Sequence, residues 1–258
     1  MSLPRVLLVE DNASLQHFVS SAFADLGVEL TCCSHVDEAL ARLRETQVVL
    51  ILTDLMMPGR SGYDLIQCLA DEPALQGAAR LVVFSAGLSH QVRERLNQPH
   101  VWRLLAKPCS LADLQACVED VLAELAQKGG PPKAAPAQAT ALPGSKSTRA
   151  LDEAIEHNFG GDRAFYASFR SDCLKQFFVD IASGDSACER GDAQGLRLVA
   201  HSLKSVLLIL GHNAEGEIAR RLEQAAALQQ WELARQGWQD LRQILQDLQA
   251  AQRLADPK

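Results

Sequence analysis

The stretch VVLILTDLMMPGRSG, residues 48–62, combines an apolar run with an acidic residue and a turn. Residues 48–52 are all apolar, and an unbroken run of this kind predicts a strand that is buried on both faces. Asp54 follows the run almost at once, and Pro58 and Gly59 are typical turn residues. Strands buried on both faces indicate a parallel sheet that is covered by helices on each side.

Similar runs recur before and after this stretch, with helical segments between them. The other predicted strands are RVLLV (5–9), VELTC (28–32), RLVVF (80–84) and VWRLL (101–105). We therefore predict an α/β, doubly wound, five-stranded parallel sheet over residues 1–126. Such sheets bind ligands beyond the carboxyl ends of their strands, so the residues that follow each strand are the candidate site.

Charged and hydroxyl side chains stand at these strand ends. Glu10 and Asp11 follow the first strand, Asp54 the third, Ser85 the fourth and Lys107 the fifth. Clustered carboxylates raise one another's pKa unless a cation joins them, and a few hard oxygen ligands suit Mg²⁺. A bound Mg²⁺ and Lys107 would then neutralise a phosphoryl group transferred to one carboxylate.

Residues 1–126 resemble the receiver domain of bacterial response regulators, which has a flavodoxin-like fold. The resemblance is carried by Glu10-Asp11, DLMMPGRSG from Asp54, Ser85-Ala86 and Lys107-Pro108. Taken singly, an Asp after a strand is usually a turn former or a helix cap, and Lys-Pro is usually an exposed loop. Their joint occurrence, in order and at strand ends, favours the site.

The resemblance implies a role for each of these residues. Asp54 would accept the phosphoryl group, and Mg²⁺ would be bound by Asp11, Asp54 and the backbone carbonyl of Met56, with Glu10 acting through water. The residues expected to contact the phosphoryl oxygens are Ser85 and Lys107, and the bond before Pro108 is expected to be cis.

One position departs from the receiver pattern. The family usually has Tyr or Phe three residues before the lysine, whereas this chain has Leu104, with Trp102 two residues earlier. We therefore hypothesise that this receiver passes its phosphoryl group on rather than driving a large surface change.

Residues 127–149 are rich in Pro, Ala and Gly and have no apolar periodicity, which is typical of a linker. The expected domains are thus 1–126, the linker and an all-α domain at 150–258. After a short lead-in, that domain is predicted to be a four-helix bundle with helices at 163–190, 193–210, 214–229 and 231–254. Asp192 and Asn213 are expected helix caps and Gly211 a helix stop.

His201 lies in the second of these helices. At about 100° per residue, the buried stripe comprises Leu196, Val199, Leu203, Val206 and Leu210. His201 falls almost opposite this stripe, and Lys204 and Ser205 share its face, with Leu208 beside them as docking area. A water-facing histidine near a lysine suits a phosphocarrier, although a lone histidine on a helix is more often simply solvated.

Residues 150–256 resemble the histidine-containing phosphotransfer (HPt) domain. The stretches that carry the resemblance are AHSLKSVLLILG, HNFGGDRAF and EIARRLEQA. The resemblance implies that His201 is the phosphoacceptor and that Lys204 supports it electrostatically. Ser205 departs from the family, which has Gly there. The hydroxyl would either obstruct a partner slightly or hydrogen-bond the phosphoryl group.

Composition limits the other classes of function. A net charge of −7 argues against direct nucleic-acid binding, and seven cysteines without a C-x-x-C pair indicate reduced thiols. No apolar run approaches the length of a membrane span, so we expect a cytoplasmic protein without membrane insertion.

Two functions remain open. The first is a phosphorelay protein without its own ATP-binding domain, whose partners are a histidine kinase and the receiver domain of another response regulator. Such a protein is not an enzyme of ATP-dependent phosphorylation, because no glycine-rich nucleotide motif is present. The second is a scaffold whose bundle docks a partner without phosphotransfer. A DNA-binding regulator would need a helix-turn-helix, which the sequence lacks.

Overall fold

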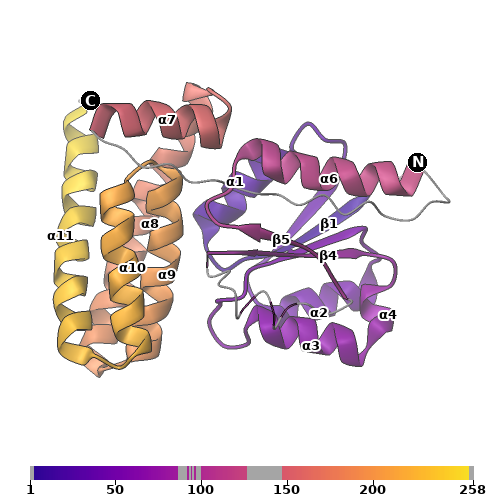
Figure 1. Ribbon diagram of the computed structural model, residues 1–258, viewed down its shortest axis with the longest axis horizontal. Coiled ribbons are helices and arrows are strands. Elements are labelled where there is room, and N and C mark those ends of the chain that lie inside the picture. Colours follow the sequence, from indigo (N-terminus) through magenta and orange to yellow (C-terminus); the bar gives the residue numbers. More distant parts are fainter. Residues whose placement is uncertain are drawn as a thin grey trace.

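The structure is a computed structural model that describes residues 3–86, 92, 94, 96, 100–126 and 147–255. Its N-terminal half is a five-stranded parallel sheet with the order β2-β1-β3-β4-β5 (Figure 1). The strands are β1 (Arg5–Val9), β2 (Glu29–Cys33), β3 (Leu50–Thr53), β4 (Arg80–Ser85) and β5 (Val101–Ala106). Each predicted strand, and the doubly wound order, is confirmed.

Helices cover both faces of the sheet. Helices α1 (Ala13–Phe23) and α6 (Leu111–Ala126) pack on one face, and α2 (Val36–Glu45), α3 (Gly62–Asp71) and the short α4 (Pro73–Gln76) pack on the other (Figure 1). An apolar cluster lies on each face of the sheet. Leu50 and Leu52 of β3 belong to the cluster on the α1 and α6 face, whereas Ile51 belongs to the cluster on the α2 and α3 face. All of β3 is buried because alternate side chains point into cores on opposite faces.

The C-terminal half is helical, as predicted. Helices α8 (Arg163–Arg190), α9 (Ala193–Ile209), α10 (Asn213–Ala227) and α11 (Trp231–Ala255) form the bundle. The expected lead-in is itself a helix, α7 (Ser147–Phe159), which lies across one end of the bundle (Figure 1). Residues 127–146 of the expected linker lie outside the described residues, and residues 147–149 belong to α7.

Two of the three residues expected to mark helix ends are confirmed. The Asp192 side chain accepts a hydrogen bond from the Gly195 amide at 2.8 Å and so caps α9. Gly211 follows α9 with a φ of 84°, a left-handed conformation that favours glycine. The prediction for Asn213 is wrong, because this residue is the first of α10 and His212 occupies the cap position.

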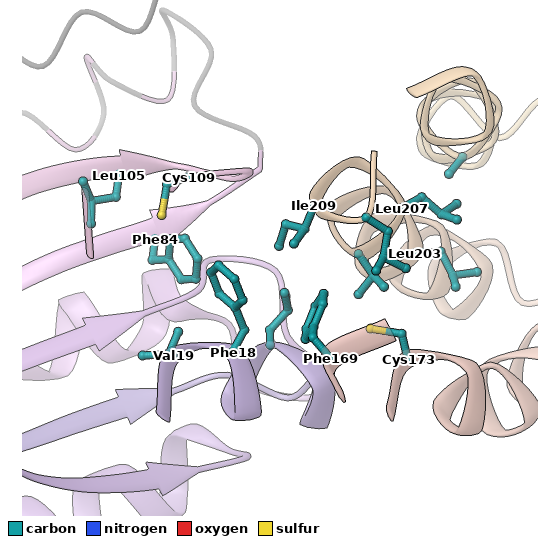
Figure 2. Packing of buried hydrophobic residues seen from close by; sticks show 14 of the residues in the cluster. Phe18, Val19, Phe84, Leu105, Cys109, Phe169, Cys173, Leu203, Leu207 and Ile209 are labelled. Atoms are coloured by element: carbon teal, nitrogen blue, oxygen red, sulfur yellow. The ribbon is translucent and has the colours of Figure 1, made fainter. Parts of the chain in front are cut away.

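The receiver and the bundle share a continuous apolar cluster, part of which is shown in Figure 2. Its centre at the boundary is Phe18 of α1, which is fully buried. The Phe18 ring centroid lies 5.3 Å from that of Phe169, 5.5 Å from that of Phe159 and 5.8 Å from that of Phe165. Aromatic rings at these separations attract one another beyond their area burial, so the two halves are docked through a packed interface.

Candidate functional site

Three carboxylates meet at the carboxyl edge of the sheet. Strands β1 and β3 are neighbours, with Val9 opposite Thr53, so the residues that follow them are brought together. Glu10, Asp11 and Asp54 each offer an oxygen atom within 4.8 Å of the others. Glu10 and Asp54 are almost fully buried, at 1% and 2% exposure. This acidic pocket is therefore the predicted cluster.

Lys107 bridges two of these carboxylates. Its ammonium lies 2.5 Å from Glu10 Oε2 and 2.7 Å from Asp54 Oδ2. The lysine follows β5, and the peptide bond between Lys107 and Pro108 is cis, as predicted. Burial by itself would lower the pKa of Lys107, but Asp54 and Glu10 raise it above its ordinary value. Lys107 therefore stays charged in the pocket.

The carboxylates of the pocket differ in their protonation behaviour. Burial raises the pKa of Glu10 to about 7 despite the opposing effect of Lys107, and burial likewise raises the pKa of Asp11. Burial would also raise the pKa of Asp54, but Lys107 and His201 outweigh it and hold that pKa below its ordinary value. Asp54 is thus the member of the set whose ionised form the pocket favours, as a nucleophile requires.

The pocket fits a small divalent cation. Oxygen ligands from two or three carboxylates are the set that Mg²⁺ prefers, because it keeps several waters of its own. Asp54 Oδ1 accepts hydrogen bonds from the backbone amides of Leu55 at 2.5 Å and Met56 at 3.3 Å, which fixes the orientation of the carboxylate. Among the described residues, the buried Ser85 hydroxyl has no hydrogen-bond partner. Such an atom is suited to an oxygen-rich group bound in the pocket.

His201 faces this pocket directly. Its Nε2 lies 3.7 Å from Asp54 Oδ2, and its Nδ1 lies 2.7 Å from Oε1 of Glu223 on α10. The expectation of a water-facing histidine is wrong, because His201 is only 2% exposed. The helical pattern placed His201 on the face of α9 opposite its main buried stripe. The receiver domain covers that face, so His201 is buried there.

Glu223 connects His201 to Lys204, whose Nζ lies 2.5 Å from Glu223 Oε2. Burial would raise the pKa of Glu223, but His201 and Lys204 lower it to about 2. Burial would lower the pKa of His201, but Asp54 and Glu223 outweigh this and leave it raised. When the imidazole is neutral, Nδ1–H donates to Glu223, and Nε2 then carries the free lone pair.

Lys204 and Ser205 were expected on an exposed face, but both are buried. The Ser205 hydroxyl donates to the carbonyl of His201 at 3.2 Å, one turn earlier in α9. It is therefore engaged with its own helix. Leu208 was expected to offer docking area, but it packs closely against Gly216 of α10.

Further contacts across the boundary were not found from the sequence. The Asn12 amide donates to the Ser202 hydroxyl at 2.6 Å, and Arg197 of α9 approaches the Met56 sulfur at 3.7 Å. Asn12 also caps α1, which is the only role that its local sequence suggests. Glu223 was missed because nothing in the spacing of the sequence pairs α9 with α10.

Comparison with known proteins defines the class. Residues 6–119 match the model of the response regulator receiver domain, and residues 168–251 match that of the Hpt domain. The two-component response regulator ORR12 of Oryza sativa subsp. japonica is 32% identical over 115 residues, which are 44% of this chain and 94% of that protein. The chain therefore belongs to the response regulator receiver family and carries a C-terminal Hpt domain.

A longer relative contains both halves. The sensory/regulatory protein RpfC of Xanthomonas campestris pv. campestris is 25% identical over 213 residues, which are 80% of this chain and 28% of that protein. The chain thus spans little more than a quarter of this relative. The signal receiver domain of a putative Luxo repressor protein from Vibrio parahaemolyticus covers 50% of this chain and 99% of its own, with 23% identity and a TM-score of 0.44. Among the described helices, none is long and apolar enough to cross a membrane.

Proposed function

We propose that this chain is an internal phosphorelay, in which Asp54 takes a phosphoryl group from a histidine kinase and passes it to His201. His201 would then deliver it to the receiver domain of another response regulator. The observation that carries the proposal is the 3.7 Å distance between His201 Nε2 and Asp54 Oδ2, inside a closed interface. A nucleophile and a carboxylate at this separation need only a small adjustment for in-line transfer.

Transfer of the phosphoryl group from Asp54 to His201 needs no additional general base. The lone pair of His201 Nε2 attacks the phosphorus of the Asp54 acyl phosphate, the N–P bond forms and the P–Oδ bond breaks. Asp54 leaves as a carboxylate, which its low pKa favours. The phosphoimidazole keeps its proton on Nδ1, where the Glu223 carboxylate at 2.7 Å stabilises the positive charge.

The surrounding residues have separate tasks in this proposal. Mg²⁺, held by Asp11, Asp54 and the Met56 carbonyl with Glu10 behind them, would supply positive charge to the phosphoryl oxygens. Ser85 would donate a hydrogen bond to the same group. Lys107 would stabilise the charge on the receiver side, and Lys204, held by Glu223, would do so on the bundle side.

The docked arrangement is suited to internal transfer only. Asp54 and His201 are each 2% exposed, so a separate kinase or receiver reaches neither of them while the domains are docked. Loading and delivery would therefore require the receiver at 1–126 to undock from the HPt domain at 150–258. Because the two belong to one chain, their effective concentration would favour redocking. We also propose a cytoplasmic location for this chain.

Intact mass after incubation with acetyl phosphate and Mg²⁺ tests the proposal. The wild-type protein, Asp54→Asn and His201→Gln are compared, and the acid and base lability of the adduct is determined. The relay predicts an adduct that requires Asp54 and then moves in part to His201 as an acid-labile phosphoramidate. An adduct that stays on Asp54 in the wild-type protein would contradict the relay and favour the scaffold alternative.

A further inference from the structure

Arg197 lies at the domain boundary, one helical turn before His201 in α9. Residues four apart share a face of a helix, so Arg197 lies on the face that the receiver covers. Its Nη2 donates to the Sδ of Met56 at 3.7 Å, across the boundary. Met56 stands two residues after Asp54, and its backbone amide donates to Asp54 Oδ1 at 3.3 Å. Arg197 thus touches the receiver beside the proposed phosphoacceptor.

The Arg197 guanidinium is poorly matched to this receiver. A thioether sulfur is only a weak acceptor, whereas an arginine carries five N–H donors. Among the described residues, the buried Nε of Arg197 has no hydrogen-bond partner, and the guanidinium forms no ion pair. A buried donor without an acceptor weakens the contact that buries it, because the donor loses water and gains nothing in return.

Other polar groups at the boundary have partners. Lys204 is held by a carboxylate of its own bundle at 2.5 Å. The Asn12 amide of the receiver donates to the Ser202 hydroxyl of the bundle at 2.6 Å. The two domains are therefore complementary near His201, and the contact between Arg197 and Met56 is a local mismatch of a charged group with an apolar one.

We propose that Arg197 selects the receiver domains that the bundle binds, and that it fits a receiver with a carboxylate two residues after the phosphoaccepting aspartate. A glutamate is about as long as a methionine, so in the place of Met56 its carboxylate would accept the donors of the guanidinium. Such a receiver binds the bundle more tightly than the receiver of this chain and replaces it beside His201. The inference rests on the proposed function in taking the partner to be a receiver domain.

The first test follows undocking in the full chain, without Mg²⁺ or a phosphodonor. His201 is 2% exposed in the docked state, so the rate of its modification by diethyl pyrocarbonate reports the undocked fraction. Peptide mass spectrometry gives this rate, with the exposed His35 and His157 as internal references. The wild-type protein is compared with Met56→Glu, Arg197→Met and the double variant. Circular dichroism melting shows whether each variant is folded.

Met56→Glu should slow the modification of His201 about tenfold. At about 1.4 kcal/mol per tenfold, this lies near the lower end of what a hydrogen bond to a charged group contributes. The slowing should disappear in the Arg197→Met background, because the effect belongs to the pair. Arg197→Met alone should change the rate by less than about twofold, since it removes a donor that has no acceptor.

A carboxylate that slows modification equally with and without Arg197, or not at all, overturns the inference. Met56→Gln is the second variant, because it supplies an acceptor without adding charge beside the acidic pocket. It should slow the modification of His201 by a smaller factor than Met56→Glu, and again only when Arg197 is present. If Met56→Glu does not fold, Met56→Gln decides by the same criterion.

Phosphotransfer between two chains extends the test to a separate receiver. The donor is Asp54→Asn, loaded on His201 with phosphoramidate. The acceptor carries His201→Gln and Arg197→Met, so that its own bundle neither takes the phosphoryl group nor pairs with its receiver. With Mg²⁺, an acceptor that also carries Met56→Glu should be phosphorylated about tenfold faster than one that keeps Met56. This preference should vanish when the donor carries Arg197→Met.

The two tests separate failure of this inference from failure of the proposed function. Labelling with acetyl phosphate shows that each acceptor is competent. A loaded donor that transfers to neither competent acceptor overturns delivery to a separate receiver, and the modification of His201 then still decides the role of Arg197. Transfer to both acceptors, with a rate ratio that does not depend on Arg197, overturns the inference alone.

Discussion

His201 Nε2 lies 3.7 Å from Asp54 Oδ2, although the two residues belong to different domains. At the same boundary, Phe18 of α1 packs against Phe159 of α7 and Phe169 of α8. Geometry and packing are therefore coupled, and a change in the packing far from the reacting atoms should alter transfer between them.

Replacing Phe18 by Leu should slow internal transfer about 10-fold without slowing phosphorylation of Asp54, because loading takes place in the undocked state. The substitution removes ring contacts with Phe159, Phe165 and Phe169, each worth about 0.5–1.5 kcal/mol. A loss of about 1.4 kcal/mol corresponds to a tenfold change in the equilibrium constant for docking. Single-turnover transfer from Asp54 to His201 measures the effect. Phe23→Leu is the control, because Phe23 is buried on the same helix but outside this aromatic cluster. Equal transfer rates in the two variants would contradict the role of Phe18.

Replacing Lys107 by Met should destabilise the receiver by about 3–5 kcal/mol in the absence of divalent cations. The loss leaves Glu10 and Asp54 buried together without their ammonium partner, and breaking a buried ion pair typically costs this much. Mg²⁺ should recover part of the stability, because it supplies positive charge to the same oxygens. Urea unfolding with and without Mg²⁺ gives the comparison. A loss of stability that Mg²⁺ does not reduce would be evidence against a metal site in the pocket.

The contribution of Glu223 to the free energy of unfolding should decrease at acidic pH. Its pKa is lowered from 4.5 to about 2 in the folded state, so its contribution is present above pH 4.5 and is lost as the pH falls through 2. At 1.36 kcal/mol per pKa unit, the full effect is on the order of 3 kcal/mol. The free energy of unfolding of the wild-type protein should exceed that of Glu223→Gln at pH 6, and the difference should shrink below pH 4.5. Urea unfolding at a series of pH values checks this, and a constant difference would refute it.

Removing the hydroxyl of Ser205 should leave phosphotransfer within about twofold of wild type. The hydroxyl donates to the His201 carbonyl in the same helix, and bonds of this type contribute little to helix stability. Ser205→Ala tests the hydroxyl alone, whereas Ser205→Gly should cost up to about 1 kcal/mol because of its lower helix propensity. Transfer rates and thermal unfolding are the measurements. A transfer rate reduced tenfold in Ser205→Ala would show that the hydroxyl acts on the phosphoryl group after all.

Leu104 stands where receiver domains usually carry an aromatic residue. The residue is partly buried and packs against the cluster of α2, α3 and the facing side of the sheet. That this receiver passes its phosphoryl group on rather than driving a large surface change stays a prediction.

The sequence by itself determined the strands, their parallel order and the acidic pocket. Each of these follows from local information: unbroken apolar runs make buried strands, and the residues that follow parallel strands must share one edge of the sheet. The cluster of Glu10, Asp11 and Asp54 was therefore predictable before any coordinates. The helices of the bundle were predictable for the same reason, since their apolar spacing is local.

Only the tertiary structure decided the environment of His201. A helical pattern reports which face of α9 meets its own bundle, but it carries no information about a second domain that covers the opposite face. The burial of His201, its contact with Asp54 and its support by Glu223 all depend on residues that are distant in sequence. These contacts arise from the docking of two domains, which local sequence patterns do not encode.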